Sequence, residues 1–281
     1  MNKSLKIFLS VLFVLAVGFF VARGCWNIEV KVTPKKMPPH APSKKKPPVK
    51  TVHKTAAAPK GTTHEMAIIL DDWGYNLTLV KNVAAIGRPI TLSILPHLPH
   101  SADIAEEAKK SGLGVMLHMP MEPKGSRAPR EPRTILTTTS DEDIRLYLDA
   151  ALESVPHVEG VNNHQGSLAT GDERVMKTVL SHLKKKGLFF VDSHVVASSV
   201  CEKVASAVGI PFASRDVFID NQTVSEDIQA QLREAQKIAL TSGRVVVIGH
   251  DKKVTVQAIH DMVPELEKNG VKLVLVKDLT Q

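Results

Sequence analysis

The chain has 281 residues and a net charge of +7, with 23% charged and 4% aromatic side chains. This length suits one large domain or two small ones. Of the 36 Lys and Arg residues, 12 lie in residues 1–63 beside one acid, which leaves 24 basic and 28 acidic groups for residues 64–281. Because that larger part is mildly acidic and poor in aromatic residues, we expect no nucleic-acid partner. The two cysteines exclude a disulfide framework.

Residues 1–24 are predicted to be a membrane anchor or a signal segment. Residues 7–22 are uncharged and almost wholly apolar, with two lysines before them and Arg23 after them. This length lies between a signal-peptide core of ~7–15 residues and a membrane span of ~20 residues. We favour an uncleaved anchor, which predicts a single-pass protein of the bacterial inner membrane with its main domain in the periplasm. Secretion into the periplasm after signal cleavage is the alternative.

Residues 25–63 are predicted to form an extended linker, because lysine and proline dominate most of the segment. Proline disfavours helices and sheet pairing, and like charges repel one another. We interpret this segment as a spacer. Its positive charge also suggests a second role, attraction to anionic lipid headgroups or to a cell-wall polymer.

From residue 64 to residue 281, apolar strands alternate with amphipathic helices. Ser101, Ser140 and Thr170 mark helix starts, and several glycines mark helix ends. This alternation predicts an α/β domain with a mostly parallel sheet, of a size that suits a (β/α) barrel. The predicted strands lie near residues 66–71, 90–95, 114–119, 159–163, 188–192, 215–219, 244–249 and 271–276.

The first of these strands runs into two adjacent carboxylates, Asp71 and Asp72. Ligands bind at the carboxyl ends of parallel strands, so these acids are placed for chemistry, although an aspartate there also caps helices. Polar residues end the later strands as well. They are His97, His100, His118, Glu122, Asn162, Asn163, His164, Asp192, Ser193, His194, Asp216 to Asp220 and His250.

Imidazole nitrogens with one carboxylate suit zinc or a similar divalent ion, and a catalytic site needs only three protein ligands. No local metal motif selects the ligands. The chain also lacks a Gly-rich phosphate loop and a Gly-x-Ser-x-Gly elbow, which argues against nucleotide and serine-hydrolase chemistry. The aperiodic segment Pro120–Thr139 follows His118 and is predicted to arch over the same face, as a substrate-covering loop or a simple insertion.

Seven motifs occur in order between Ile69 and His250: Ile-Leu-Asp-Asp-Trp-Gly-Tyr, Ser-Ile-Leu-Pro-His, Met-Leu-His-Met-Pro-Met-Glu-Pro, Gly-Val-Asn-Asn-His-Gln-Gly-Ser, Phe-Val-Asp-Ser, Arg-Asp-Val-Phe-Ile-Asp and Ile-Gly-His. In this order they resemble the divergent polysaccharide deacetylase family, a distant branch of the metal-dependent carbohydrate esterases, and the resemblance covers essentially all of residues 65–281. The resemblance implies a distorted (β/α) barrel, which we expect to have about seven to eight strands.

The resemblance also implies roles for individual residues. Asp71 corresponds to the general base, Asp72 and His118 to metal ligands, and His250 to the general acid. Glu122 stands where the esterases carry a second ligand histidine, so His164 or His100 would complete the ligand set, and we favour His164. Asn163, Asp192 and Asp216 are further candidate site residues.

The implied activity is metal-dependent hydrolysis of N-acetyl groups on an envelope polysaccharide built of amino sugars, with peptidoglycan as the nearest candidate polymer. The implied cofactor is a divalent metal, with zinc as the first choice. One alternative is a non-catalytic envelope protein that binds a glycan or another protein with the same fold. A second alternative keeps the metal and hydrolyses a peptide amide or a phosphoester.

Overall fold

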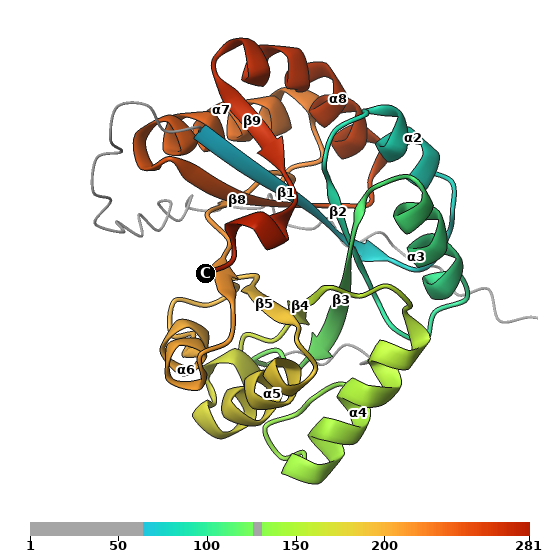
Figure 1. The fold of residues 1–281 in the computed structure, drawn as a ribbon, viewed down its shortest axis with the longest axis vertical. Coiled ribbons are helices and arrows are strands. Elements are labelled where there is room, and N and C mark those ends of the chain that lie inside the picture. The colour runs from blue at the N-terminus through green and yellow to red at the C-terminus, as the bar shows by residue number, and fades with distance from the viewer. Residues whose placement is uncertain (1–63, 126–130) are drawn as a thin grey trace, which may run out of the picture. The chain divides into compact units, whose positions relative to one another are not determined.

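The computed structural model describes residues 64–125 and 131–281. The predicted anchor or signal segment and the Lys/Pro-rich linker lie outside the described residues. Among the residues that are described, no helix has the length and apolar character that crossing a membrane requires. The predicted alternation of strands and helices is confirmed from residue 64 onward (Figure 1).

Within residues 64–125 and 131–281, nine strands form one sheet, and every pairing in it is parallel. They are β1 (His64–Trp73), β2 (Thr91–Ile94), β3 (Gly114–Met121), β4 (Gly160–Gln165), β5 (Phe189–Asp192), β6 (Phe212–Ser214), β7 (Val217–Phe218), β8 (Arg244–His250) and β9 (Val271–Val274).

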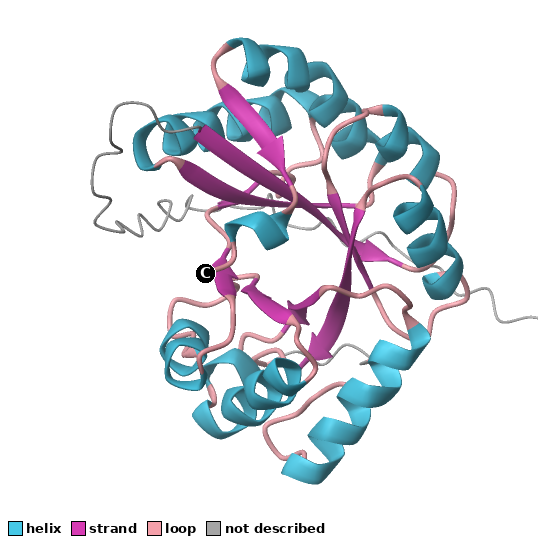
Figure 2. Ribbon diagram, viewed as in Figure 1, coloured by secondary structure: helices cyan, strands magenta, loops and turns pink. Residues whose placement is uncertain are grey.

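Helices pack on the outer side of the curved sheet, as Figure 2 shows. They are α2 (Val80–Ala85), α3 (Ser101–Lys110), α4 (Asp141–Ser154), α5 (Glu173–Lys185), α6 (Cys201–Val208), α7 (Ser225–Ser242) and α8 (Lys253–Lys268), with short 3₁₀ turns at Ala169–Gly171 and Val276–Leu279. Local signals explain some of the starts. The Ser140 side chain caps α4 by accepting a hydrogen bond from the Asp143 N–H, and Asp172, rather than Thr170, caps α5.

The sheet curls into a distorted barrel. Its strand order is β6-β5-β4-β3-β2-β1-β8-β7, and β9 pairs with the first half of β1. Only Arg215 and Asp216 separate the two edge strands in the sequence. The Arg215 N–H bonds to β5 and the Asp216 N–H bonds to β8, so the chain itself crosses from one edge to the other. The predicted α/β barrel is therefore confirmed.

The strand predicted at 215–219 is shorter than expected, and β6 precedes it as a separate strand. Both pieces are too short for a periodic apolar pattern, since β6 has three residues and β7 has two. The third strand is longer than predicted. It continues through Pro120 to Met121, and the proline carbonyl accepts a hydrogen bond from Ile135 of the returning loop.

Alternate strand residues face two different hydrophobic layers. Outward residues such as Leu70 and Leu117 pack against the helices, whereas inward residues such as Ile69 and Ile248 fill the barrel interior. Gly160 is an inward position in β4, where an added Cβ would lie 2.2 Å from the Phe189 ring. Along β1, β3, β4 and β8 the inward positions become polar at the carboxyl ends, so the polar site lies on top of this interior core.

Candidate metal centre

A β-bulge at the end of β1 brings its two neighbouring carboxylates to one site. The register with β2 shifts by one residue between Leu70 and Trp73, and Asp72 has a φ of 67°. Consecutive residues of a regular strand point to opposite faces, and a bulge re-aims a side chain. As a result, Asp71 and Asp72 both reach the same imidazole, that of His118, at 3.8 Å and 3.3 Å.

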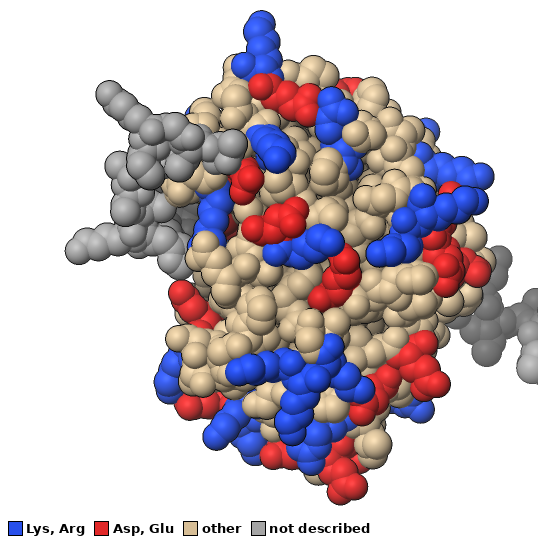
Figure 3. Space-filling view, viewed as in Figure 1, with Lys and Arg blue, Asp and Glu red and all other residues tan. Residues whose placement is uncertain are grey.

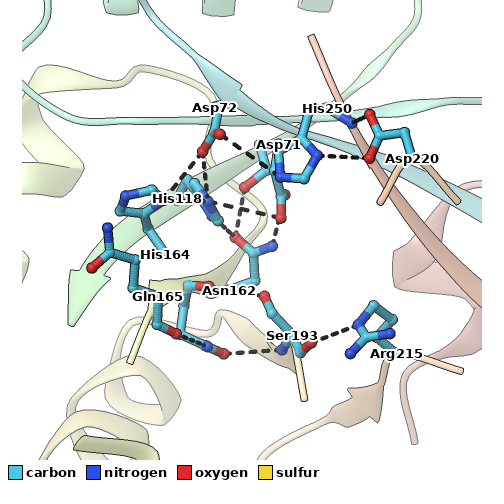
Figure 4. Close-up of polar contacts among 12 residues, drawn as sticks. Asp71, Asp72, His118, Asn162, His164, Gln165, Ser193, Arg215, Asp220 and His250 are labelled. Carbon is cyan, nitrogen blue, oxygen red and sulfur yellow. Dashed lines mark hydrogen bonds and ion pairs between the residues drawn. The ribbon is translucent and has the colours of Figure 1, made fainter. Parts of the chain in front are cut away.

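Asp72, His118 and His164 form what we call the ligand triad. Their potential ligand atoms all lie within 4.8 Å of one another. Asp72 Oδ1 is 3.3 Å from His118 Nε2 and 3.1 Å from His164 Nδ1, and those two nitrogens are 3.1 Å apart (Figure 4). His118 comes from β3 and His164 from the neighbouring β4, where Pro120 is paired with His164 in register. Parallel pairing therefore creates the site.

The second nitrogen of each triad imidazole faces a separate partner. His118 Nδ1 lies 2.7 Å from the amide oxygen of Asn162, and His164 Nε2 lies 3.4 Å from a carboxylate oxygen of Glu131. Metal-bound histidines commonly donate their other ring N–H to such a group, which fixes the tautomer and the ring orientation. In this arrangement His118 Nε2 and His164 Nδ1 are the nitrogens that face Asp72, and each would present a lone pair there once it is deprotonated to bind an ion.

The triad fits a divalent ion by its own chemistry. Asp72 Oδ1 is buried yet accepts no well-aligned hydrogen bond, although two imidazole nitrogens lie close to it. A buried acceptor left in this state costs free energy unless a cation satisfies it. One carboxylate and two imidazoles are also a donor set that suits zinc.

The charges of the triad interact strongly. Burial raises the pKa of Asp72, but His118 and His164 outweigh this effect and hold that pKa well below its usual range. Burial lowers the pKa of His118, whereas Asp71 and Asp72 together raise it to about 9. Asp71 and Asp72 thus stabilise the positive charge of protonated His118, and the same carboxylates would stabilise a cation bound at this point.

Asp71 lies beneath the triad and is almost fully buried. Its Oδ1 accepts a hydrogen bond of 2.9 Å from the Asn162 side-chain amide, and its Oδ2 lies 3.8 Å from His118 Nε2. Burial is the largest influence on this carboxyl and raises its pKa above the usual range, although His118 acts in the opposite direction. A buried carboxylate with a raised pKa beside a metal site suits a general base.

His250 lies on the other side of Asp72. Its Nδ1 is 2.8 Å from Asp220 Oδ1, and its Nε2 is 3.7 Å from Asp72 Oδ2. Asp220 also accepts hydrogen bonds from the His250 N–H and the Thr255 hydroxyl, so its orientation is fixed. Burial lowers the pKa of His250, but the bond to Asp220 and its charge raise it overall. The imidazole is therefore held with Nε2 toward the triad and with its charged form favoured.

Two of the predicted additional residues lie outside this group. His100 precedes α3, and its ring is 3.5 Å from Asp103. The Glu122 carboxylate accepts hydrogen bonds from the backbone and the hydroxyl of Thr137, so it fastens the returning loop to the end of β3. His164 is therefore the histidine that lies beside His118.

The other three additional candidates bond mainly to nearby backbone. Asn163 accepts a hydrogen bond from the Ser193 N–H and donates to the Gln165 carbonyl. Asp192 accepts from the His194 N–H and the Ser199 hydroxyl, and Asp216 accepts from the Val246 N–H. These residues shape the rim of the barrel and do not join the triad.

The sequence places Asn162 and Asp220 among the polar strand ends but indicates no role for them, and it does not predict that Glu131 belongs to the site. Two-residue periodicity could have indicated Asn162, because residues 162 and 164 of one strand share a face whereas Asn163 points to the other. Nothing local marks Glu131, which the returning loop brings to His164.

A groove of about 470 Å³ lies elsewhere, on the outer side of α4 and α5. Its lining includes Arg145, Arg174, Lys177 and Lys185, and Figure 3 shows Lys and Arg side chains gathered over this part of the surface. Arg174 is paired with Asp141, and Lys203 with Glu173. The groove contains no residue of the triad, so we do not assign the chemistry to it.

The fold and the site together define a parallel (β/α)-barrel protein with a candidate metal centre at the carboxyl ends of its strands. The model of the divergent polysaccharide deacetylase family matches residues 68–280, and the chain belongs to this family.

The Uncharacterized protein YibQ of Escherichia coli K12 is 32% identical over 202 residues, which are 72% of this chain. The match spans 63% of that relative's length, a little under two thirds. Two solved structures are similar to this chain. An uncharacterized protein of Agrobacterium tumefaciens C58 has a TM-score of 0.74 and 21% identity, and the match covers 80% of this chain and 92% of that one. The catalytic domain of a peptidoglycan N-acetylglucosamine deacetylase from Eubacterium rectale has a TM-score of 0.50 and 15% identity, and the match covers 79% of this chain and 92% of that domain. These structural similarities concern the fold.

Proposed function

We propose that the protein is a metal-dependent hydrolase that removes N-acetyl groups from an envelope polysaccharide. The observation that carries this proposal is the ligand triad, flanked by a buried carboxylate on one side and a carboxylate-bound histidine on the other. The family match supports a polysaccharide deacetylase-like activity. The polymer, the metal and the periplasmic location are parts of the proposal.

Asp72, His118 and His164 would hold the ion. When bound, a divalent ion such as zinc supplies positive charge that polarises the acetyl carbonyl and acidifies the attacking water. These three side chains already converge on one point, so binding requires little rearrangement of the chain.

Asp71 would accept the proton of the attacking water. Its Oδ1 is occupied by the Asn162 amide, and its Oδ2 faces the triad, so the carboxylate is presented in one orientation. The raised pKa of Asp71 increases its proton affinity, as the base of this step requires.

His250 would donate a proton to the amine as the carbon–nitrogen bond breaks. Its Nδ1 is engaged by Asp220, and its Nε2 faces the triad. The reaction then yields acetate and a free amino sugar: the water oxygen joins the acetyl carbon, and the nitrogen leaves as an amine. The proton that Asp71 takes from water balances the proton that His250 gives to the nitrogen, and exchange with solvent returns both side chains to their starting forms. The net reaction is amide plus water to acetate plus the ammonium form of the amino sugar.

Peptidoglycan is our first choice of polymer. The structurally similar Eubacterium rectale protein carries peptidoglycan N-acetylglucosamine deacetylase in its name. The predicted N-terminal segment, as an inner-membrane anchor or a cleaved signal, would place this domain next to such a polymer in the periplasm.

The test is the metal content and the activity of the full-length chain, prepared without chelator. We expect about one zinc or similar ion per chain, and release of acetate from peptidoglycan or another acetylated amino-sugar polymer. Asp71→Asn should retain the ion and lose acetate release. A chain that takes up no metal when zinc is supplied contradicts the proposal and favours a non-catalytic binding protein. Hydrolysis restricted to peptide amides or phosphoesters contradicts the deacetylase assignment.

A further inference from the structure

Asn162 occupies the point where the triad and the proposed base meet. It lies in β4, its side chain is inaccessible to solvent, and it faces the barrel interior below His164. Its Oδ1 is 2.6 Å from the Ser93 hydroxyl and 2.7 Å from His118 Nδ1. Its Nδ2 donates to Asp71 Oδ1 at 2.9 Å. One amide therefore contacts a ligand and the base at once.

The chemistry of the partners decides how this amide is oriented. Asp71, as a base, presents carboxylate oxygens, which accept hydrogen bonds, so the amide NH₂ must face it. Turning the amide over would place its oxygen against the carboxylate and its NH₂ against His118. The Ser93 hydroxyl supports the observed orientation by donating to Oδ1. His118 Nδ1 must then carry a proton to donate to the same oxygen.

The proton on His118 Nδ1 also determines which nitrogen of this ring can bind a metal ion. Binding an ion requires the neutral ring. With its single proton on Nδ1, the lone pair of that ring lies on Nε2, the nitrogen that is 3.3 Å from Asp72 Oδ1 and 3.1 Å from His164 Nδ1. A ring held this way is ready to bind an ion, whereas the other neutral tautomer presents an N–H to the same point.

We propose that Asn162 is a positioning residue that selects the metal-binding nitrogen of His118 and, through the same amide, orients Asp71. This inference rests on the proposed function for the role of Asp71, but its effect on metal binding is independent of turnover. Asn162 would thereby couple metal binding to proton abstraction from water, because its amide oxygen accepts from the ligand His118 and its amide nitrogen donates to the base Asp71.

Two substitutions separate the two halves of the amide. Asn162→Asp keeps an oxygen that accepts from His118 Nδ1–H, but it loses the N–H donor and places a second carboxylate against Asp71. We expect zinc affinity close to that of the wild type and a loss of turnover of about 100-fold, since a misplaced catalytic group costs this much. Asn162→Ala removes both halves, so zinc affinity should also fall, by ~10–100-fold.

Asn163→Ala is the matched control. Asn163 is the next residue, it is equally buried, and its side chain bonds to the backbone of Ser193 and Gln165. Both alanine variants lose buried hydrogen bonds and should melt at lower temperature. Only Asn162→Ala should change zinc affinity and the visible absorption spectrum of the cobalt-loaded chain, which reports ligand geometry. A purely structural role predicts equal effects on both readouts in the two variants.

The experiment uses the full-length chain and measures zinc affinity by competition with a chromophoric chelator, the cobalt spectrum, and acetate release. Wild-type zinc affinity in Asn162→Ala would overturn the inference, as would full turnover in Asn162→Asp. If the wild type binds zinc but hydrolyses no acetylated sugar, the proposed function fails while the affinity and spectrum still decide the ligand half. A wild type that binds no metal would overturn both.

Discussion

The polar residues at the carboxyl ends of the strands fall into two groups with different consequences. Inward-facing residues lie on top of the barrel interior: His118 is part of the triad, and Asp71 and His250 lie beside it. Asn163 and Asp192 end neighbouring strands, yet they bond to nearby backbone and rim side chains. A polar residue at a strand end is therefore not sufficient for membership of the site, because the face of the strand decides which partners it meets.

Loss of the triad carboxylate is the strongest test of this distinction. Asp72→Asn keeps a residue type that tolerates the positive φ of this position, so the bulge should persist. Without the negative charge, the two histidines alone should bind zinc at least ~100-fold more weakly, beyond the loss expected for an outer partner of a ligand. Chelator competition measures this change. Unchanged affinity would remove Asp72 from the ligand set.

Substitution of Asp220 tests the role of His250, which lies outside the triad. Asp220→Asn removes the carboxylate that orients His250 and favours its charged form, so turnover should fall by about 100-fold, as for loss of general acid catalysis. Zinc affinity should stay at the wild-type value. Acetate release and chelator competition on the same preparation give both numbers. A large loss of zinc with unchanged turnover would contradict the assigned role of His250.

The same residue makes a prediction about pH and stability. Burial opposes the charged form of Asp220, but its bonds to His250 outweigh burial and lower its pKa to about 2. A carboxyl whose folded pKa is depressed stabilises the fold above its unfolded pKa, and this stabilisation is lost as pH falls toward the folded value. The advantage of wild type over Asp220→Asn in free energy of unfolding should therefore be full from about pH 4 up to the raised pKa of His250, and shrink toward pH 2. Denaturant titrations across this range measure it, and a constant difference would contradict it.

Glu131 should have a smaller effect than the triad. Glu131→Gln weakens the partner of His164 Nε2 while the ligand nitrogen remains, so zinc affinity should fall by about 10-fold. Zinc competition detects this change, with Glu122→Gln as the control, since that carboxylate binds Thr137 and lies outside the triad. Equal losses in both variants would mean that the loop matters only for folding.

The smallest effect on metal binding is expected for strand-end residues that face away from the barrel interior, such as Asp192. Asp192→Asn changes a buried carboxylate that accepts hydrogen bonds from the His194 N–H and the Ser199 hydroxyl. We expect about 1–3 kcal/mol lower free energy of unfolding and unchanged zinc affinity. Denaturant unfolding and chelator competition report the two quantities. Loss of zinc at wild-type stability would place Asp192 with the site.

Much of this architecture could be predicted from the sequence. The apolar runs and glycine stops located most strands and helices, and the parallel arrangement follows from their alternation. Since parallel strands end at one edge, the sequence also indicated that Asp72, His118 and His164 share a rim. The short strand β6 was missed, because three residues carry no readable period.

What the tertiary structure alone decided is how the side chains are aimed. Two adjacent aspartates in a strand should face opposite ways, and only the bulge against β2 turns both toward His118. The register between β3 and β4 chose His164 as its neighbour and brought Asn162 opposite His118. These relations depend on contacts between segments far apart in the chain. The sequence by itself therefore determined which elements form and which chemistry they carry, whereas pairing and register determined which groups meet.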